Sequence, residues 1–507
     1  MSTTALRRLS DLVDRLAADG QMPEAVRAAL AAAAVGREVT APVTADSRRV
    51  ATGGVFVAIP GFKRDGAEFA AAAAAAGATA IVAERDLRLG VPTLVVRSAR
   101  RALAIAATWW EGDPAESLIV VGVTGTDGKT TTATFLSTAL SACGIRTGLI
   151  STAISRIGGV QHPAAAHQTT PEAPELQAQL RAVAAAGDAA VVLETTSHGL
   201  ELERVGGIAY AAAVITTFSP DHLDLHGSVE AYRAAKLRLL ERVAGSAASR
   251  AAGLPPVAVI RTSDAEMAPF AAAAARAGLR IVSYDATVAD ELVVEGVRYP
   301  VTLAMPGVIN ARNAAAALAL VVAWGLPVQP ALDALAAEPG PPGRSEQVRA
   351  GQPFAVIVDF AHTGPSLAAA LGLARGLCAP GGRVLLVTGA AGERDPGRRT
   401  AIGSASVAAD RVWVADEDPR HEDPAEIAAT ILAARIAAGG APGDATALHD
   451  RRAAIAAAID AARAGDVVLL AGKGHERTIE RRGIDEPWDE VAAAREALAS
   501  LGYPHGQ

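Results

Sequence analysis

The chain has 507 residues, of which 50% are hydrophobic and 20% charged, and its 47 Lys and Arg against 54 Asp and Glu leave a net charge of −7. This balance is typical of a folded globular chain and excludes an intrinsically disordered one, and the lack of a basic excess argues against nucleic-acid binding. At roughly 150 residues per domain, the length predicts about three domains.

The N-terminal twenty residues mix charged with apolar side chains, where a secretory signal would have an unbroken apolar block. The longest apolar stretch free of charged and amide side chains, Ala314 to Val328, is shorter than the roughly 18 to 20 residues of a spanning helix and contains Gly325 and Pro327. The two cysteines, Cys143 and Cys378, belong to no CxxC or His-rich pattern, so neither a disulfide framework nor a zinc site is predicted. We therefore expect a cytoplasmic protein without membrane insertion.

Breaks in the sequence pattern predict the domain boundaries. The first part is mixed, with a strand over residues 54–59 and an Ala-rich helix that ends at Gly77. The segment Glu111-Gly112-Asp113-Pro114 interrupts the pattern, and the prolines and glycines of residues 338–343 form a linker, because they continue neither a helix nor a central strand. The predicted domains are 1–112, 113–338 and 339–507.

Strand-like and helical stretches alternate in both later domains, which predicts parallel sheets covered by helices. The strands expected in the second domain are residues 117–124, 189–193 and 211–217, followed by a helix at 230–243. The strands expected in the third are residues 354–358, 383–388, 411–415 and 466–470. The predicted fold class is α/β, with a small mixed N-terminal domain, a central P-loop-type parallel-sheet domain and a C-terminal Rossmann-like domain.

A glycine-rich turn comes directly after the strand at 117–124. Its sequence is Gly125-Thr126-Asp127-Gly128-Lys129-Thr130-Thr131. A strand, such a turn and a helix N-terminus form an anion cradle, in which Lys129 adds a charge and Thr130 offers an oxygen to Mg²⁺. The match to G-x-x-x-x-G-K-[ST] is imperfect, since Val123 occupies the first glycine position. The turn predicts a nucleoside triphosphate site, and the alternative is a glycine-rich turn with an incidental lysine.

Polar side chains follow the next two predicted strands. Glu194 comes directly after residues 189–193, and His222 follows the strand at 211–217. Because ligands of open α/β sheets bind at the carboxyl ends of the strands, both side chains should lie on the edge that carries Lys129. Glu194 is a candidate Mg²⁺ ligand and His222 a candidate ligand of a second ion. Each alone could be a capping or solvated residue, but three on one edge argue against that alternative.

Further motifs follow along almost the whole chain. They are Asp46-Ser47-Arg48, Gly54 to Gly61, Asp65-Gly66, Thr169-Thr170-Pro171, Glu194 to Leu200, Asp221 to Asp224, Lys236, Asn310 to Asn313, Pro342-Gly343-Arg344, Asp359 to Thr363, Gly392 to Asp395, Asp418-Pro419-Arg420 and Gly472 to Glu476. In this order they resemble the Mur ligase family, and within it the UDP-N-acetylmuramoyl-tripeptide synthetases.

The resemblance implies ATP-dependent amide synthesis in the making of peptidoglycan precursors. The γ-carboxylate of D-Glu in UDP-N-acetylmuramoyl-L-Ala-D-Glu takes the γ-phosphoryl group of ATP, and the amine of a diamino acid attacks the resulting acyl phosphate. ATP and Mg²⁺ are the implied cofactors, the other partners are the two small-molecule substrates, and we expect a monomer.

The resemblance also implies roles for single residues. Lys129, Glu194, His222 and Lys236 would be catalytic; Thr130, Glu194, His222 and Lys236 would hold metal, with Lys236 carbamylated to N6-carboxylysine. ATP would contact Gly125, Thr126, Asp127, Gly128, Lys129, Thr130, Thr131, Asn310, Asn313, Arg344, Asp359 and His362. The UDP-sugar peptide would contact Ser47, Arg48, Thr169, Thr170, Ser197 and Arg204, and the incoming amino acid Arg394, Asp418, Pro419, Arg420, Gly472 and Glu476. From the residues alone, Lys236 is better explained as a solvated helix lysine.

One departure from the family pattern concerns the choice of amino acid. The D-N-P-R signature, which the family associates with meso-diaminopimelate, appears here as Glu417-Asp418-Pro419-Arg420. Arg420 can pair with a carboxylate through two hydrogen bonds. Asp418 adds a negative charge that would disfavour a second carboxylate and favour the ammonium of lysine or ornithine. Meso-diaminopimelate, L-lysine and L-ornithine therefore stay open. Asp127 for Asn, Thr196 for Ser and Phe360 for Tyr are the milder departures.

Two other functions are the alternatives. One is another amide ligase of the same superfamily, such as a folylpolyglutamate synthase or the D-Ala-D-Ala-adding enzyme. The other is a P-loop module that binds a nucleotide without using it, against which the presence of Glu194, His222, Lys236 and Asp359 argues.

Overall fold

The computed structural model describes residues 6–62, 64–164, 168–243, 245 and 247–503. The chain forms two compact units: the first extends to Tyr284 and includes residues 294–296 and 316–331, and the second comprises 285–293, 297–315 and 332 onward. Each unit contains parallel strands with helices packed against them, which confirms the predicted α/β class. The boundaries near residues 112 and 338 stay predictions. Among the described residues, no helix combines the length and the apolar character needed to cross a bilayer.

The chain up to Glu111 folds around a short sheet. Its elements are β1 Arg7–Arg8, α1 Leu9–Ala18, α2 Glu24–Ala34, β2 Glu38–Val39, β3 Val43–Thr44, η1 Ser47–Arg49, β4 Val55–Val57, η2 Gly66–Phe69, α3 Ala70–Ala75, β5 Ala80–Ala83, β6 Thr93–Val95 and α4 Ala99–Glu111. The strands β3-β4-β5-β6 form a parallel sheet in that order. Ser98 caps the N-terminus of α4, where its hydroxyl accepts from the Arg101 amide, and Gly112 follows the helix in the left-handed conformation.

The longest sheet belongs to residues 114–337. The elements there are η3 Pro114–Ser117, β7 Ile119–Thr124, α5 Lys129–Ala142, β8 Thr147–Ile150, β9 Ile154–Ile157, β10 Val160–Pro163, α6 Ala173–Ala185, β11 Ala190–Glu194, α7 Ser197–Glu201, β12 Ala212–Ile215, α8 Leu223–His226, α9 Val229–Glu241, α10 Ala247–Ala251, β13 Val257–Ile260, η4 Ala265–Met267, α11 Ala268–Arg276, β14 Arg280–Asp285, β15 Glu291–Val294, β16 Val297–Pro300, α12 Val308–Ala323 and α13 Val328–Ala337. The strand order is β10-β9-β8-β11-β7-β12-β13-β14-β15-β16.

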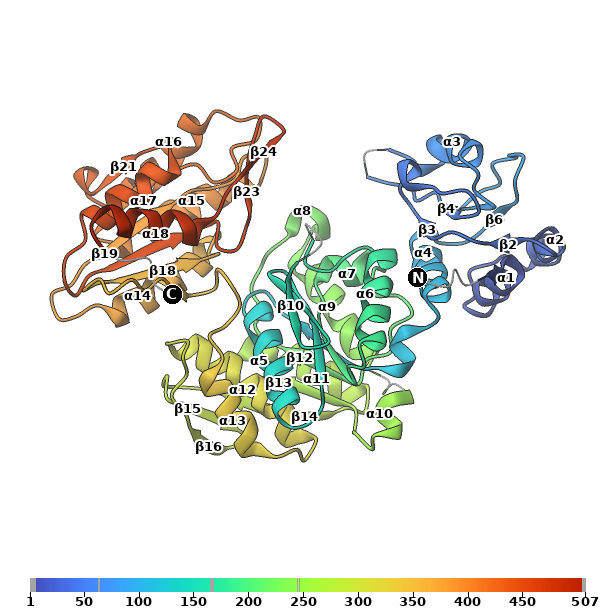
Figure 1. Ribbon diagram of the computed structural model, residues 1–507, viewed down its shortest axis with the longest axis horizontal. Coiled ribbons are helices and arrows are strands. Elements are labelled where there is room, and N and C mark those ends of the chain that lie inside the picture. The colour runs from blue at the N-terminus through green and yellow to red at the C-terminus, as the bar shows by residue number, and fades with distance from the viewer. Residues whose placement is uncertain (1–5, 63, 165–167, 244, 246, 504–507) are drawn as a thin grey trace. The chain divides into compact units, whose positions relative to one another are not determined.

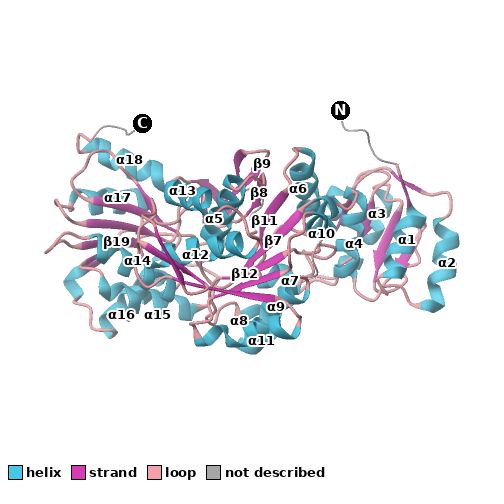
Figure 2. Ribbon diagram, turned by 90° about the horizontal axis from the view of Figure 1, so that it is seen from below, coloured by secondary structure: helices cyan, strands magenta, loops and turns pink. Residues whose placement is uncertain are grey.

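The six neighbouring strands β8, β11, β7, β12, β13 and β14 run parallel, as predicted. Strands β9 and β10 add an antiparallel pair at the edge next to β8. Figure 2 shows β8, β11 and β7 side by side, with helix α5 against them. Strands β7, β11 and β12 are buried along their whole length, so they are continuous apolar runs rather than alternating ones.

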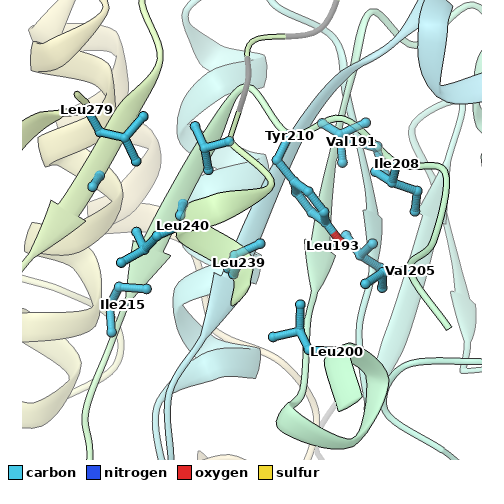
Figure 3. Packing of buried hydrophobic residues seen from close by; sticks show 14 of the residues in the cluster. Val191, Leu193, Leu200, Val205, Ile208, Tyr210, Ile215, Leu239, Leu240 and Leu279 are labelled. Atoms are coloured by element: carbon cyan, nitrogen blue, oxygen red, sulfur yellow. The ribbon is translucent and has the colours of Figure 1, made fainter. Parts of the chain in front are cut away.

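The register of these central strands positions the site. Glu194 pairs with Val123, and Ile215 with Thr124, so β7, β11 and β12 end at nearly the same level of the sheet. The core beneath this edge is apolar and includes Leu193 and Tyr210 (Figure 3). The three strand ends therefore deliver their following residues to one edge.

The second unit contains a six-stranded sheet. Its elements are β17 Glu346–Gln347, β18 Ala355–Asp359, α14 Gly364–Leu377, β19 Val384–Thr388, α15 Pro396–Ala405, η5 Ser406–Ala408, β20 Arg411–Val414, α16 Pro424–Ala437, η6 Pro442–Asp444, β21 Ala445–Ala447, α17 Arg451–Asp460, β22 Val467–Ala471, β23 Thr478–Arg481, β24 Ile484–Pro487 and α18 Glu490–Ser500 (Figure 1). The order is β17-β18-β22-β19-β20-β21, parallel except for β17. Aspartates cap the helices α15, α16, α17 and α18.

Replacing Leu193 by Ala should destabilise the first unit by about 2–5 kcal/mol, because the side chain is fully buried and its loss leaves a cavity. Urea unfolding of both proteins measures this difference. The matched control is Val160→Ala on the exposed strand β10, which should change the unfolding free energy by less than about 0.5 kcal/mol. Equal effects of the two substitutions would contradict the assigned core.

Candidate active site

The glycine-rich turn joins β7 to α5 and is held against the end of β12. The Thr126 amide donates to the Thr217 carbonyl at 2.8 Å, and the Thr216 hydroxyl donates to the Asp127 carbonyl at 2.6 Å. Gly125 has φ +151°, and a Cβ there would lie 1.9 Å from the Thr216 hydroxyl oxygen, so only glycine fits. The turn is thus fixed in a shape that leads directly into the N-terminus of α5, where anions bind.

Two lysines approach this turn. Lys129 Nζ donates to the carbonyls of Gly125 at 3.2 Å and Thr126 at 2.7 Å. Lys236, on α9, is 2% exposed, and its Nζ donates to the same Gly125 carbonyl at 2.7 Å and lies 4.5 Å from the centre of the Tyr232 ring. Burial, followed by the charge of Lys129, holds the pKa of Lys236 well below its ordinary value. The alternative of a solvated lysine at 236 is wrong, because this face of α9 is packed against the turn and buries the side chain.

Glu194 places a buried carboxylate in the site. It ends β11, is 1% exposed, and accepts the Thr130 hydroxyl, which lies 3.1 Å from each of its two carboxylate oxygens. The Thr152 amide and hydroxyl both donate to Glu194 Oε2 at 3.0 Å. Sequence reasoning missed Thr152, which lies after β8 and carries no motif.

These oxygens suit a magnesium ion. Mg²⁺ takes hard oxygen ligands and few of them from protein, and Thr130 and Glu194 supply such a pair at the helix N-terminus. Within the described part of the chain, no three His, Cys, Asp or Glu side chains converge on one metal position. The donor set therefore fits an ion that is bound mainly by substrate phosphates, as Mg²⁺ is in nucleotide sites.

Three histidines pack beside the two lysines. His222 precedes α8 and has φ +52°. The ring centre of His198 lies 4.6 Å from that of His222 and 5.7 Å from that of His226. The rings of His222 and His226 also contact Tyr232, whose hydroxyl lies 3.2 Å from that of Thr126. Burial lowers the pKa of His222, and burial with the charge of His222 lowers that of His198 to about 4. At neutral pH the rings are uncharged, as metal-binding imidazoles must be.

Residues predicted for the sugar peptide surround Glu194. Thr170 donates to the Glu194 carbonyl at 2.9 Å, Arg204 donates to the Thr170 carbonyl at 3.1 Å, and the hydroxyl oxygens of Thr169 and Thr152 lie 3.0 Å apart. Ser197 is buried at the start of α7. In the N-terminal sheet region, Arg48 is exposed and pairs with Asp46 at 2.8 Å, in the same short helix as Ser47.

The nucleotide residues predicted beyond residue 300 lie in the second unit. Asn310 and Asn313 are buried on α12, where the side-chain amide of Asn310 donates to the Pro306 carbonyl at 2.9 Å. Arg344 lies 4.4 Å from the centre of the Phe360 ring, beside His362, whose Nδ1 is 2.8 Å from the Phe360 carbonyl. Asp359 accepts from the Ser345 amide at 2.7 Å. Arg344, Asp359 and His362 thus gather at the end of β18.

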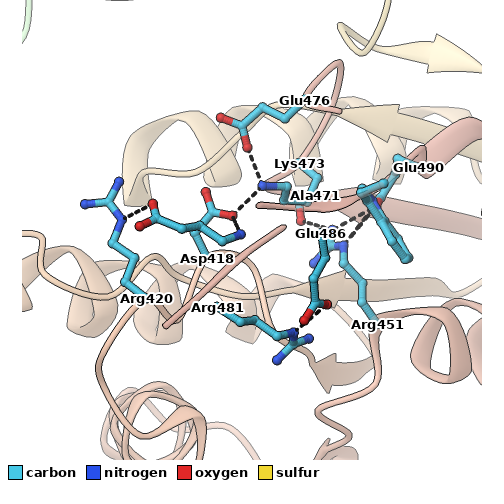
Figure 4. Close-up of polar contacts among 11 residues, drawn as sticks. Asp418, Arg420, Arg451, Ala471, Lys473, Glu476, Arg481, Glu486 and Glu490 are labelled. Atoms are coloured by element: carbon cyan, nitrogen blue, oxygen red, sulfur yellow. Dashed lines mark hydrogen bonds and ion pairs between the residues drawn. The ribbon is translucent and has the colours of Figure 1, made fainter. Parts of the chain in front are cut away.

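Asp418, Arg420 and Glu476, three of the residues predicted for the incoming amino acid, lie near one another in the second unit (Figure 4). Lys473 Nζ lies 2.8 Å from Asp418 Oδ1 and 2.6 Å from Glu476 Oε2, and Arg420 Nε lies 3.2 Å from Glu480 Oε2. The loop that leads to Arg394 joins them, since the Gly392 amide donates to the Asp418 carbonyl at 2.8 Å.

Gly472 and Pro419 complete this set. Gly472 has φ +110°, and a Cβ there would lie 2.8 Å from Glu417 Oε2. The Pro419 carbonyl oxygen packs against Gly392, where a Cβ would lie 2.2 Å from it. Burial raises the pKa of Glu417 to about 7. Sequence reasoning gave no role to Glu417 or Lys473, although a lysine between two glycines three residues before Glu476 is a usable signal.

The sequence matches three models of the Mur ligase family. They are described as "Mur ligase family, catalytic domain" over residues 41–108, "Mur ligase middle domain" over 123–321 and "Mur ligase, glutamate ligase domain" over 343–474. The chain is 43% identical to a UDP-N-acetylmuramyl-tripeptide synthetase of Roseiflexus sp. (strain RS-1), across 91% of this chain and 95% of the relative. It is 39% identical to a UDP-N-acetylmuramoyl-L-alanyl-D-glutamate–2,6-diaminopimelate ligase of Caulobacter vibrioides, across 91% and 96%.

Solved structures agree in fold. One titled as a UDP-N-acetylmuramoyl-L-alanyl-D-glutamate–2,6-diaminopimelate ligase has a TM-score of 0.61 at 29% identity and covers 91% of this chain and 95% of its own. The MurF ligase of Thermotoga maritima in complex with ADP has a TM-score of 0.59 at 20% identity, across 91% and 98%. At that lower identity the likeness concerns the fold alone.

Glu417 should make stability depend on pH. Because its folded pKa of about 7 exceeds the ordinary 4.5, its contribution is fully present below pH 4.5 and is lost as the pH rises through 7. Between pH 4 and 8 the wild type should therefore lose about 3 kcal/mol of unfolding free energy that the Glu417→Gln variant does not lose. Urea unfolding across that range measures it, with Glu496→Gln at an exposed position as control. Parallel pH profiles of the unfolding free energy for wild type and Glu417→Gln would contradict the raised pKa of Glu417.

Proposed function

The chain belongs to the Mur ligase family, and we propose that it joins 2,6-diaminopimelate to the D-Glu γ-carboxylate of UDP-N-acetylmuramoyl-L-Ala-D-Glu, at the expense of ATP, in peptidoglycan precursor synthesis. The observation that carries this proposal is the gathering of Lys129, Lys236 and the Thr130–Glu194 pair around one phosphate-binding turn.

The first step is phosphoryl transfer. A γ-carboxylate oxygen of D-Glu attacks the γ-phosphorus of ATP, and the bond from that phosphorus to the ADP oxygen breaks. Lys129 and the N-terminus of α5 hold the triphosphate in line and balance its charge. Thr130, Glu194 and His222 would hold Mg²⁺, which when bound neutralises phosphate charge.

The second step forms the amide. The neutral amine of the amino acid attacks the carbonyl carbon of the acyl phosphate, phosphate leaves with the C–O bond electrons, and the nitrogen loses a proton. Arg204 and Thr170, linked by a hydrogen bond of 3.1 Å, lie beside Glu194 and would keep the peptide near the phosphate turn. Most of the acceleration then comes from positioning and charge balance.

Lys236 supports the proposed carbamylation. Only an uncharged amine attacks CO₂, and burial holds the pKa of Lys236 well below its ordinary value. The product is an anionic carbamate with release of one proton. In place of an amine that donates to the Gly125 carbonyl, the site then has an oxygen ligand on α9.

The choice of 2,6-diaminopimelate rests on Arg420 and Asp418. The guanidinium of Arg420 suits a second carboxylate. The charge of Asp418, which by itself disfavours such a group, is paired with the Lys473 ammonium at 2.8 Å. The argument for lysine or ornithine assumed an unpaired aspartate and so loses its basis.

We also propose that the protein works in the cytoplasm as a monomer. Cys143 and Cys378 are free thiols, as is usual in a reducing compartment, and sedimentation measures the oligomeric state.

Purified protein with ATP, Mg²⁺ and UDP-N-acetylmuramoyl-L-Ala-D-Glu should give a tripeptide product of the expected mass with meso-diaminopimelate. Its kcat/KM should exceed those for L-lysine and L-ornithine by about 10- to 100-fold, since one charge-assisted carboxylate pair contributes about 1.5–3 kcal/mol. Equal values for the three amines would contradict the selectivity. ATP hydrolysis that ignores the amine would instead favour a nucleotide-binding module.

Lys236→Ala should lower kcat by about 100-fold or more, the cost of removing one fixed charge at a reacting centre. Added acetate or another short carboxylate should restore part of the activity, since it replaces the carbamate oxygens. Arg238→Ala, at a half-exposed position of the same helix, is the control and should keep wild-type activity. Full activity of Lys236→Ala without a carboxylate would contradict the bridging role.

A further inference from the structure

A buried ammonium joins two of the acids at the proposed amino-acid site. Lys473 is 0% exposed, and its Nζ lies within 2.8 Å of both Asp418 Oδ1 and Glu476 Oε2. Asp418 Oδ1 also accepts from the Glu480 amide at 2.9 Å, so its orientation is fixed twice. We call Asp418, Lys473 and Glu476 the charged triad; Figure 4 shows them converging on the ammonium.

The hairpin that follows the triad sets the position of Arg420. The Arg420 amide donates to the Glu480 carbonyl at 3.0 Å, and the Arg482 amide donates to the Arg420 carbonyl at 2.8 Å. Arg420 itself has φ +53°, an unusual conformation for its residue type that these bonds maintain. Its guanidinium is balanced by Glu480, with Nε and Oε2 3.2 Å apart. Arg420 and Asp418 of the triad are thus both hydrogen-bonded to the backbone of Glu480.

The charges of the triad do not cancel. One ammonium faces two carboxylates, which leaves one negative charge, the amount that a single ligand ammonium would balance. Without Lys473 the carboxylates of Asp418 and Glu476 would repel each other, and the ligand would meet two negative charges in place of one.

From this arrangement we propose that Lys473 is a positioning residue that sets the amino-acid specificity: it lets Asp418 and Glu476 bind the distal ammonium of a diamino acid without repelling a distal carboxylate from Arg420. This inference rests on the proposed ligase function. It assigns the selectivity to the net charge of the triad, rather than to Asp418 alone, because a carboxylate that is already paired exerts little repulsion on a second anion.

Three variants of the full-length protein test the triad: Lys473→Met, Asp418→Asn and the double variant. The readout is the ratio of kcat/KM for meso-diaminopimelate to that for L-lysine, measured together with KM for ATP. Lys473→Met should lower the ratio by about tenfold or more, Asp418→Asn should raise it, and the double variant should return it to within about threefold of wild type. KM for ATP should stay the same in all three.

Arg435→Met is the matched control. Arg435 is also buried in the second unit, where it donates to the carbonyl of Ala409 at 3.1 Å, so its loss damages packing without touching the triad. It should lower stability and leave the ratio unchanged. A ratio that moves equally in Arg435→Met and Lys473→Met would overturn the proposal.

An active Lys473→Met protein with an unchanged ratio would also overturn it, while leaving the ligase function in place. If Lys473→Met does not fold, Asp418→Asn decides: a higher ratio supports the proposal and an unchanged one overturns it. Wild-type protein that ligates neither amine would remove the ligase function and this inference with it.

Discussion

The buried carboxylate of Glu194 is the constraint on which the first unit depends. An ionised group taken out of water costs several kcal/mol unless it is fully hydrogen-bonded. Glu194 meets that demand with Thr130 from the start of α5 and Thr152 from beyond β8. The same residue accepts Thr170 through its backbone carbonyl. Thr130 of the phosphate site and Thr170, one of the residues proposed for the sugar peptide, are therefore hydrogen-bonded to the same residue.

The same rule governs the second unit with the signs reversed. There a buried ammonium, Lys473, needs anions, and the chain supplies two that the family pattern assigns to substrate. Binding residues thus stabilise the fold as well as recognising a ligand. A similar buried pair, Arg451 with Glu490 at 2.6 Å, lies deeper in the unit and has no part in the proposed site.

Two points that the residues alone left open depend on distant neighbours. Local pattern could not distinguish a surface Lys236 from one in the site, and the side chain is buried beside Gly125. Asp418 looked like an unpaired charge, yet it shares the Lys473 ammonium with Glu476. In both cases the deciding neighbour lies more than fifty positions away in the sequence. The edge strands β9 and β10 were missed because β10 is exposed throughout and has no apolar pattern.

The sequence by itself determined the α/β class, the central parallel strands and the chemistry of the phosphate turn, because apolar runs, glycines and a strand–turn–helix succession are local signals. It also determined the family, through motifs that occur in a recognisable order. Only the tertiary structure decided which charges are buried and what neutralises each of them. The physical reason is that the energy of a charge depends on everything packed around it, and packing joins segments that no local pattern relates.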